Sequence, residues 1–146
     1  MLSRVPVLLA LGVSLMGVAS AVAETPEQAI RRVLDDQVRA WNRGDLKGFM
    51  EGYWKSDKLT FSSGGDQTKG WQATLDRFRK RYQGEGREMG KLAFTEINVE
   101  LLGADSAFVR GRWQLVRSKD RPGGVFTLIL RRLPEGWRIV HDHTSN

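Results

Sequence analysis

The second half of the chain alternates apolar and polar residues over four long segments, and no other feature restricts the fold as much. Alternation with a period of two is typical of β-strands that bury one face. Turn-forming sequences at 103–106, 118–124 and 134–136 separate the segments, so consecutive strands are expected to form hairpins. The expected strands cover residues 91–102, 107–116, 125–132 and 137–145. Together they predict an antiparallel meander.

The first of these strands contains an irregularity. Its apolar residues change parity between Phe94 and Ile97. Because a residue inserted in one strand moves every later side chain to the opposite face, this change predicts a β-bulge or a bend near Thr95.

The first half of the chain predicts three helices and one short strand. Thr25 and Gln28 have the spacing of a capping box around Pro26, which favours a helix start. Apolar residues recur at helical spacing after each expected start. The expected helices cover residues 26–41, 46–53 and 71–82, and the short strand covers residues 59–62. Helices that precede a meander predict an α+β fold with the helices on one sheet face.

Residues 1–23 have the features of a signal peptide. Arg4 precedes an apolar run that ends in Ala-Val-Ala, and we expect cleavage between Ala23 and Glu24. The run is shorter than the roughly 20 residues of a membrane span, so we expect no membrane span in the mature form. These features predict a single exported domain over residues 24–146, periplasmic or secreted.

The absence of cysteine and the excess of basic residues limit the kinds of site that the chain can form. The chain has no cysteine, which excludes disulfides, thiolate metal sites and thiol nucleophiles. Of its 23 basic residues one is Arg4, which leaves 22 against 17 acidic residues and a net charge of +5 after cleavage. Much of the basic excess lies within residues 77–91, where it is typical of a solvated helix face. Because the protein is expected to be exported, we expect no nucleic-acid partner.

The sheet face turned away from the helices is too apolar for simple solvation. It combines arginines with large apolar side chains, which on a soluble monomer are rarely contiguous. The apolar residues expected there are Phe108, Val116, Val125, Ile129 and Val140. A homodimer that buries part of this face explains the pattern.

Three segments resemble a known superfamily. They are AWNRGDLKGFMEGY at residues 40–53, GWQATLDRFRKRY at 70–82 and GWRIVHDHTS at 136–145. These segments, together with the order of elements, resemble the nuclear-transport-factor-2-like superfamily, in particular its SnoaL-like (DUF4440) group. The last segment is also similar to the end of the calcium/calmodulin-dependent kinase association domain. The resemblance covers nearly all of residues 25–146.

The resemblance implies a cone-shaped, cystatin-like roll whose bent sheet and helices enclose a pocket. It also implies a homodimer, which is the usual state in this superfamily. The members include isomerases, dehydratases, cyclases, hydrolases and non-catalytic binding or assembly domains, so the fold alone selects no function.

The last expected strand carries the only two histidines of the chain, His141 and His143. Strict alternation groups them with Trp137 and Ile139 on the interior face and sends Asp142 to the opposite face. We therefore expect both imidazoles to point into the pocket, for proton transfer or for contact with an anionic ligand. Hydrogen bonds to neighbouring backbone or hydroxyl groups are the structural alternative.

A metal site is not expected in this pocket. Two histidines at i and i+2 are able to share an ion, but a catalytic site usually has three protein ligands, and no carboxylate is placed as the third. We expect no other cofactor either.

Aromatic side chains are further candidates for the pocket lining. Tyr53, Trp54 and Trp71 come from the second and third helices, and Trp113 lies on the more apolar face of its strand. Ser62 lies on the short strand, where the resemblance implies polar pocket groups. Burial in the core is the alternative for the aromatic residues.

Three functions remain open from the sequence. The leading hypothesis is an exported module that binds a small-molecule ligand, anionic or aromatic. The second is a cofactor-free lyase, isomerase or hydrolase with one histidine as general base. The third is an association domain that serves dimerisation alone, which requires a filled cone and an extensive buried sheet face.

Overall fold

The computed structural model describes residues 21–145. The predicted leader therefore lies outside the described residues, except for its last three positions. The elements run in the order α1 (Pro26–Asn42), α2 (Leu46–Met50), β1 (Thr60–Ser63), β2 (Asp66–Lys69), α3 (Trp71–Tyr82), β3 (Lys91–Leu101), β4 (Ser106–Val116), β5 (Gly123–Leu133) and β6 (Gly136–Thr144). No helix within residues 21–145 is long and apolar enough to cross a membrane.

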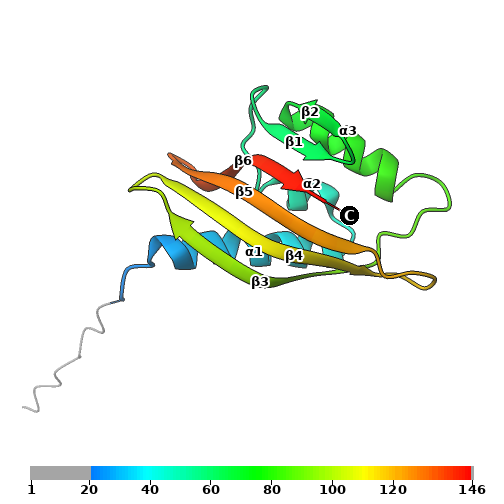
Figure 1. Ribbon diagram of the computed structural model, residues 1–146, viewed down its shortest axis with the longest axis horizontal. Helices are drawn as coiled ribbons and strands as arrows, with labels where there is room; N and C mark the ends of the chain where they lie inside the picture. Colours follow the sequence, from blue (N-terminus) through cyan, green and yellow to red (C-terminus); the bar gives the residue numbers. More distant parts are fainter. Residues whose placement is uncertain (1–20, 146) are drawn as a thin grey trace, which may run out of the picture.

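One curved sheet of six strands forms the frame of the described chain. The strand order is β2-β1-β6-β5-β4-β3. Neighbouring strands are antiparallel except β1 and β6, which are parallel. In the view of Figure 1, α1 and α2 lie behind the sheet, so the face toward the reader is free of them. The α+β class and the meander from β3 to β6 are confirmed.

The start of α1 is fixed by its capping box, as the sequence predicted. The backbone N–H of Gln28 donates to Thr25 Oγ1 at 3.2 Å, and the N–H of Thr25 donates to Gln28 Oε1 at 2.9 Å. These bonds satisfy backbone donors that have no partner inside the helix. The buried face of the helix, which includes Ile30, Leu34 and Trp41, then packs toward the sheet.

The strand β2 was missed by the sequence analysis. Its residues, Asp66–Lys69, pair with β1 as a hairpin, and Gly64 and Gly65 in the turn both have positive φ angles. The segment Asp-Gln-Thr-Lys has no apolar residue, so it carries no alternation that could reveal a strand.

The predicted bulge near Thr95 is confirmed. The pairing of β3 with β4 shifts between Thr95 and Asn98, and Glu96 adopts a left-handed φ of 53°. Gly111 lies opposite the bulge, where a Cβ atom would come within 2.5 Å of Phe126 Cζ. The absence of a side chain at Gly111 therefore lets Phe126 fill the inside of the bend.

A second bulge, in β6, was not predicted and changes which side chains face inward. On β5, Leu130 pairs with Ile139 and Ile129 pairs with His141, so Val140 is the extra residue. Because one inserted residue reverses the alternation, Ile139 and Asp142 are both buried, whereas His143 is exposed. The alternation assumed from the sequence holds only up to Ile139.

Candidate functional site

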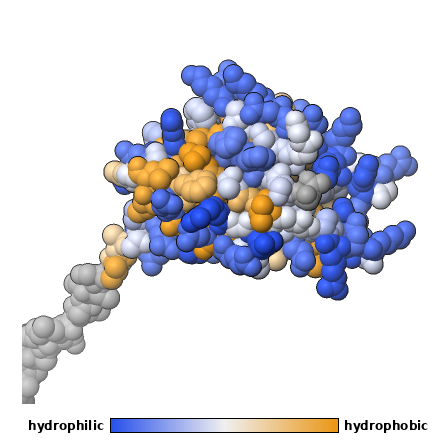
Figure 2. Space-filling model, in the orientation of Figure 1, coloured by the Kyte–Doolittle hydropathy of each residue, from blue (hydrophilic) through white to orange (hydrophobic). Residues whose placement is uncertain are grey.

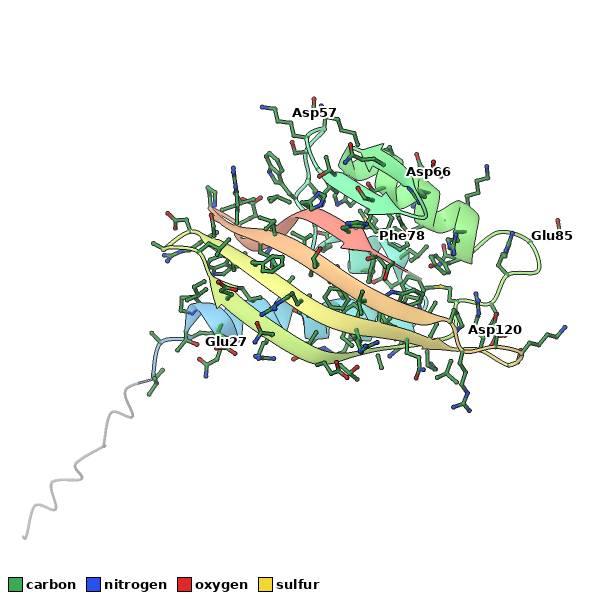
Figure 3. The ribbon with its side chains drawn as sticks, viewed as in Figure 1. Glu27, Asp57, Asp66, Phe78, Glu85 and Asp120 are labelled. Atoms are coloured by element: carbon green, nitrogen blue, oxygen red, sulfur yellow. The ribbon has the colours of Figure 1, made fainter. Side chains whose placement is uncertain are left out.

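A cavity of about 80 Å³ lies between the sheet and the helices. Its walls are mainly aromatic, and Phe78 reaches it from α3 (Figure 3). The Phe78 ring lies 5.3 Å from that of Phe49 on α2 and 5.2 Å from that of Phe61 on β1, so three elements close one wall. The polar residues of the lining are Gln37, Ser63, Arg77, Arg81, Asp142 and Thr144.

Asp142 is the buried acid of the cavity, with 4% of its surface exposed. Tyr53 donates its hydroxyl proton to Asp142 Oδ2 at 2.7 Å, and Thr144 donates to Oδ1 at 2.6 Å. Burial raises the pKa of Asp142 to about 6, and the hydrogen bonds from Thr144 and Tyr53 oppose this rise. The carboxyl group therefore changes its protonation state close to neutral pH.

Tyr53 is held opposite Asp142 by backbone pairing with the bulged strand. Ile139 N–H donates to Gly52 O, and Trp54 N–H donates to Ile139 O, both at 2.9 Å. Burial raises the pKa of Tyr53 well above its usual range, and the charge of Asp142 adds to this effect. The phenol therefore remains protonated and donates to the carboxylate.

Arg77 is the half-buried cation of the cavity. Its guanidinium donates to Thr68 Oγ1 and to the Ser63 carbonyl oxygen, each at 2.9 Å, and lies 5.1 Å from the centre of the Phe61 ring. The guanidinium is thus fixed by the β1–β2 hairpin. No acidic side chain within residues 21–145 forms an ion pair with it.

The prediction that both histidines face the cavity was wrong. His141 and His143 lie on the other side of β6, because the extra residue at Val140 turns Asp142 inward in their place. His141 Nδ1 is within 2.6 Å of Thr60 Oγ1 on β1. Burial lowers the pKa of His141, and the neighbouring His143 adds to the decrease.

Of the other predicted lining residues, two line the cavity and three do not. Tyr53 and Trp113 are part of its wall. Trp71 instead donates its indole N–H to the Met50 carbonyl oxygen at 2.8 Å. Trp54 is half-buried outside the lining, and Ser62 faces away because it alternates with Phe61 and Ser63, which line the cavity.

Several site residues were missed by the sequence analysis. Arg77 and Arg81 were assigned to a solvated helix face, although each directly precedes a residue of the apolar stripe, Phe78 or Tyr82. That adjacency was the available signal, since a long arginine next to a buried residue reaches the edge of an apolar surface. Asp142 had no such signal, because the residues after Val140 are all polar.

The described chain offers no cluster typical of a resident metal ion. Within residues 21–145, no group of three or more histidine, cysteine, aspartate or glutamate residues is arranged to hold one. The groups that line the cavity supply hydrogen bonding, charge pairing at the arginines and proton exchange at Asp142.

The sequence matches the SnoaL-like domain over residues 30–146. A crystal structure of an NTF-2 like protein of unknown function from Shewanella oneidensis is 41% identical, with a TM-score of 0.79 over 84% of this chain and 100% of that chain. No curated protein matches the sequence.

More distant structures share the fold alone. A putative calcium/calmodulin-dependent protein kinase type II association domain from Thiobacillus denitrificans is 24% identical, with a TM-score of 0.66 over 86% of this chain and 98% of that chain. A ketosteroid isomerase-like protein from Erwinia carotovora is 21% identical, with a TM-score of 0.61 over 80% of this chain and 92% of that chain.

Proposed function

We propose that this chain, which belongs to the SnoaL-like domain family, is an exported protein that binds a small carboxylate with an apolar or aromatic body in the cavity described above. The observation that carries this proposal is the presence of two arginines, Arg77 and Arg81, in a lining that is mostly apolar and rich in aromatic residues. Pockets of this composition bind the ligand body by apolar contact and orient it by a few polar groups. The leader-like residues 1–23 support export.

The cavity volume favours a compact ligand. A single buried water needs roughly 10–15 Å³, so a cavity of about 80 Å³ holds the equivalent of several waters. Sites for drug-sized ligands measure roughly 300–1,000 Å³. We therefore expect one short chain or one small ring rather than a polycyclic molecule.

The state of Arg77 favours an acidic group on this ligand. Two N–H groups of its guanidinium are engaged, by Thr68 and Ser63, out of the five that an arginine carries. A half-buried guanidinium without a carboxylate partner in the described chain is well suited to a ligand carboxylate, since such hydrogen bonds are charge-assisted and often bidentate.

Calorimetry on matched ligand pairs tests the proposal. Small aliphatic and aromatic carboxylates are titrated into the protein alongside the corresponding primary amides, which have the same shape but no charge. We expect at least one carboxylate to bind and its amide to bind more than about tenfold more weakly, because a charge-assisted hydrogen bond contributes about 1.5–3 kcal/mol. Equal affinity for acids and amides would contradict the proposal.

Two arginine variants on α3 sharpen this experiment. Arg77→Met keeps an unbranched apolar stem but removes the guanidinium and its charge, and we expect about 10–100-fold weaker carboxylate binding. Arg79→Gln is the matched control, because Arg79 is exposed on the same helix and lies next to Asp76 instead of the cavity. An equal effect of both substitutions would point to general electrostatic attraction instead of a site.

The second candidate function is cofactor-free acid–base catalysis by Asp142. A carboxyl group with a pKa of about 6 accepts and releases protons readily near neutral pH, and enzymes use raised carboxyl pKa values in this way. Asp142 therefore takes the role that the sequence analysis gave to a histidine. Tyr53, already bonded to this carboxyl group, supplies the second polar group within reach.

Hydrogen exchange at the ligand separates binding from catalysis. A carboxylate found to bind by calorimetry is incubated with the protein in deuterated water, and exchange at its C–H positions is followed by NMR. Catalysis predicts exchange that is lost in Asp142→Asn, with binding retained. If the native protein binds the carboxylate but does not exchange its C–H hydrogens, the result contradicts acid–base catalysis by Asp142 and supports ligand binding alone.

We also propose a homodimer through the uncovered face of the sheet. Phe108 and Ile129 are half-buried register partners there, and Val125 is 46% exposed. Figure 2 shows hydrophobic residues gathered toward one end of this face, surrounded by hydrophilic ones. Sedimentation analysis of the native chain and of Ile129→Asp tests this assembly. A native chain that sediments as a monomer would contradict it.

A further inference from the structure

The outer side of the β1–β6 pair brings the two histidines of the chain together. Residues at i and i+2 on a strand point to the same face and lie about 6.7 Å apart. His141 and His143 have this spacing on β6, beyond the bulge at Val140. The parallel pairing places Thr60 beside His141 and Ser62 beside His143. All four residues belong to one outer patch, separate from the cavity on the inner face.

The His141 ring is oriented by its neighbour on β1. Its Nδ1 atom lies 2.6 Å from Thr60 Oγ1, which leaves Nε2 as the nitrogen without this contact. Histidines that bind metals commonly use one ring nitrogen for the ion and hold the other by a hydrogen bond. When Nδ1 donates to the threonine hydroxyl, the lone pair of Nε2 is available to an ion.

His143 is the more solvent-exposed of the two histidines. Its side chain is exposed, and its register neighbours on the two adjacent strands are the polar residues Ser62 and Thr127. An exposed imidazole among hydroxyl groups can turn toward a common ion without breaking any packing. No cysteine and no third histidine exist in the chain to compete for it.

From this juxtaposition we propose that His141 and His143 chelate one divalent transition-metal ion on the outer face of β6, with water in the remaining positions. The ion class is one that prefers imidazole, and Cu²⁺ is expected to bind more tightly than Zn²⁺. This site differs from the catalytic metal site that the sequence analysis rejected, because a surface chelate needs no third protein ligand. It is independent of the carboxylate proposed for the cavity, but it shares the outer sheet face with the proposed homodimer, because His141 and His143 pair with Ile129 and Thr127 on β5. The metal titration is therefore run on both the native chain and Ile129→Asp.

A titration of the mature protein, prepared without a histidine tag, tests the proposal. Cu²⁺ and Zn²⁺ are added separately at pH 7.5 and followed by calorimetry. We expect one ion per chain, with Cu²⁺ the tighter of the two. His143→Ala should weaken Cu²⁺ binding by at least tenfold, and because His143 is exposed this variant should fold normally. No Cu²⁺ binding, or binding unchanged in His143→Ala, would overturn the proposal.

Two substitutions on β1 test the geometry in opposite directions. Thr60→Val removes the group that orients His141, and loss of such an orienting partner typically weakens metal binding about 10–100-fold. Ser62→His places a third imidazole beside His143, and we expect tighter Zn²⁺ binding, since zinc favours three or four protein ligands. A Ser62→His variant that binds Zn²⁺ no better than the native chain would argue against convergence of these side chains.

Discussion

The two ends of the molecule use the same strands for different purposes. At one end, Leu130 on β5 pairs with Ala107 on β4, and both side chains are fully buried outside the cavity lining. At the other end, the same strands surround a cavity that contains the carboxyl group of Asp142. The first end is a packed apolar core, and the second keeps polar groups and empty space inside the fold.

The packed end and the hollow end are expected to contribute differently to fold stability and to ligand binding. Apolar burial at the packed end stabilises the fold in proportion to the area removed from water. A buried carboxyl group lowers stability whenever it is charged, because its hydrogen bonds only partly replace hydration. We therefore expect substitutions at the packed end to weaken the fold and substitutions at the hollow end to change binding.

The largest expected effect is at the packed end. Leu130→Ala should lower the free energy of unfolding by about 2–5 kcal/mol, because it leaves a void in a close-packed core. Carboxylate binding by the remaining folded protein should be nearly unchanged. Chemical denaturation measures the first quantity, with Leu101→Ala as the control, since Leu101 is 47% exposed. An equal decrease in the free energy of unfolding for Leu130→Ala and Leu101→Ala would contradict the assignment of Leu130 to a close-packed core.

At the hollow end, Asp142→Asn should increase stability above neutral pH. The pKa of Asp142 is about 6 in the folded protein against 3.8 for the unperturbed group, so the folded state holds this proton more tightly. Stability is therefore lost as the pH rises from about 4 to about 6, on the order of 3 kcal/mol in total. Asparagine carries no such charge, so the variant should be more stable at pH 8 and similar to the native chain at pH 4.

Denaturation curves at both pH values check this prediction, with the exposed Asp105→Asn as control. A variant that is less stable than the native protein at pH 8 would show that the hydrogen bonds from Tyr53 and Thr144 outweigh the burial of the charge. In that case the hollow end would contribute to stability like the packed end.

Tyr53→Phe should have a smaller effect of the opposite sign. It removes the donor to Asp142 Oδ2 and leaves a buried acceptor unsatisfied, which costs about 1–3 kcal/mol. The pKa of Asp142 should rise further, because the hydrogen bond from Tyr53 favours the charged form. Carbon-13 NMR of the carboxyl group follows this titration. A pKa that falls in the variant would contradict the assigned contact.

The smallest expected effect concerns the β3 bulge. Glu96→Gly should stabilise the protein by about 0.5 kcal/mol, because glycine adopts a left-handed φ without the penalty of about 1 kcal/mol that other residues incur. The lost ion pair with Arg112 is exposed and contributes little. Thermal unfolding of the variant, compared with Arg112→Gln, separates the two contributions.

The two bulges explain how far the sequence could predict this fold. In β3 the apolar residues on both sides of Thr95 change parity, so the irregularity was visible. In β6 only polar residues follow the adjacent Ile139 and Val140, so no apolar side chain marks the new parity and the irregularity was not visible. The fold was therefore predictable, whereas the inward placement of Asp142 depended on a register shift.

The cavity was predictable only in part for the same reason. Tyr53 and Trp113 were identified because aromatic residues lie on apolar faces that the pattern defines. The positions of Arg77 and Ser63 depend on how the β1–β2 hairpin lies against α3, and the polar sequence of β2 gives no indication of that hairpin. Sequence periodicity assigns faces of single elements, and it does not assign contacts between elements.

The central claim is that the bulge at Val140 turns Asp142 inward and His143 outward, and cysteine accessibility tests it most directly. The chain contains no cysteine, so Asp142→Cys and His143→Cys each introduce a single thiol. The rate of reaction with a water-soluble thiol reagent is measured for each folded variant and for the same variant in denaturant. We predict rapid labelling at position 143 and strong protection at position 142. Rapid labelling at 142 with protection at 143 would contradict the bulged register and restore the histidines to the interior.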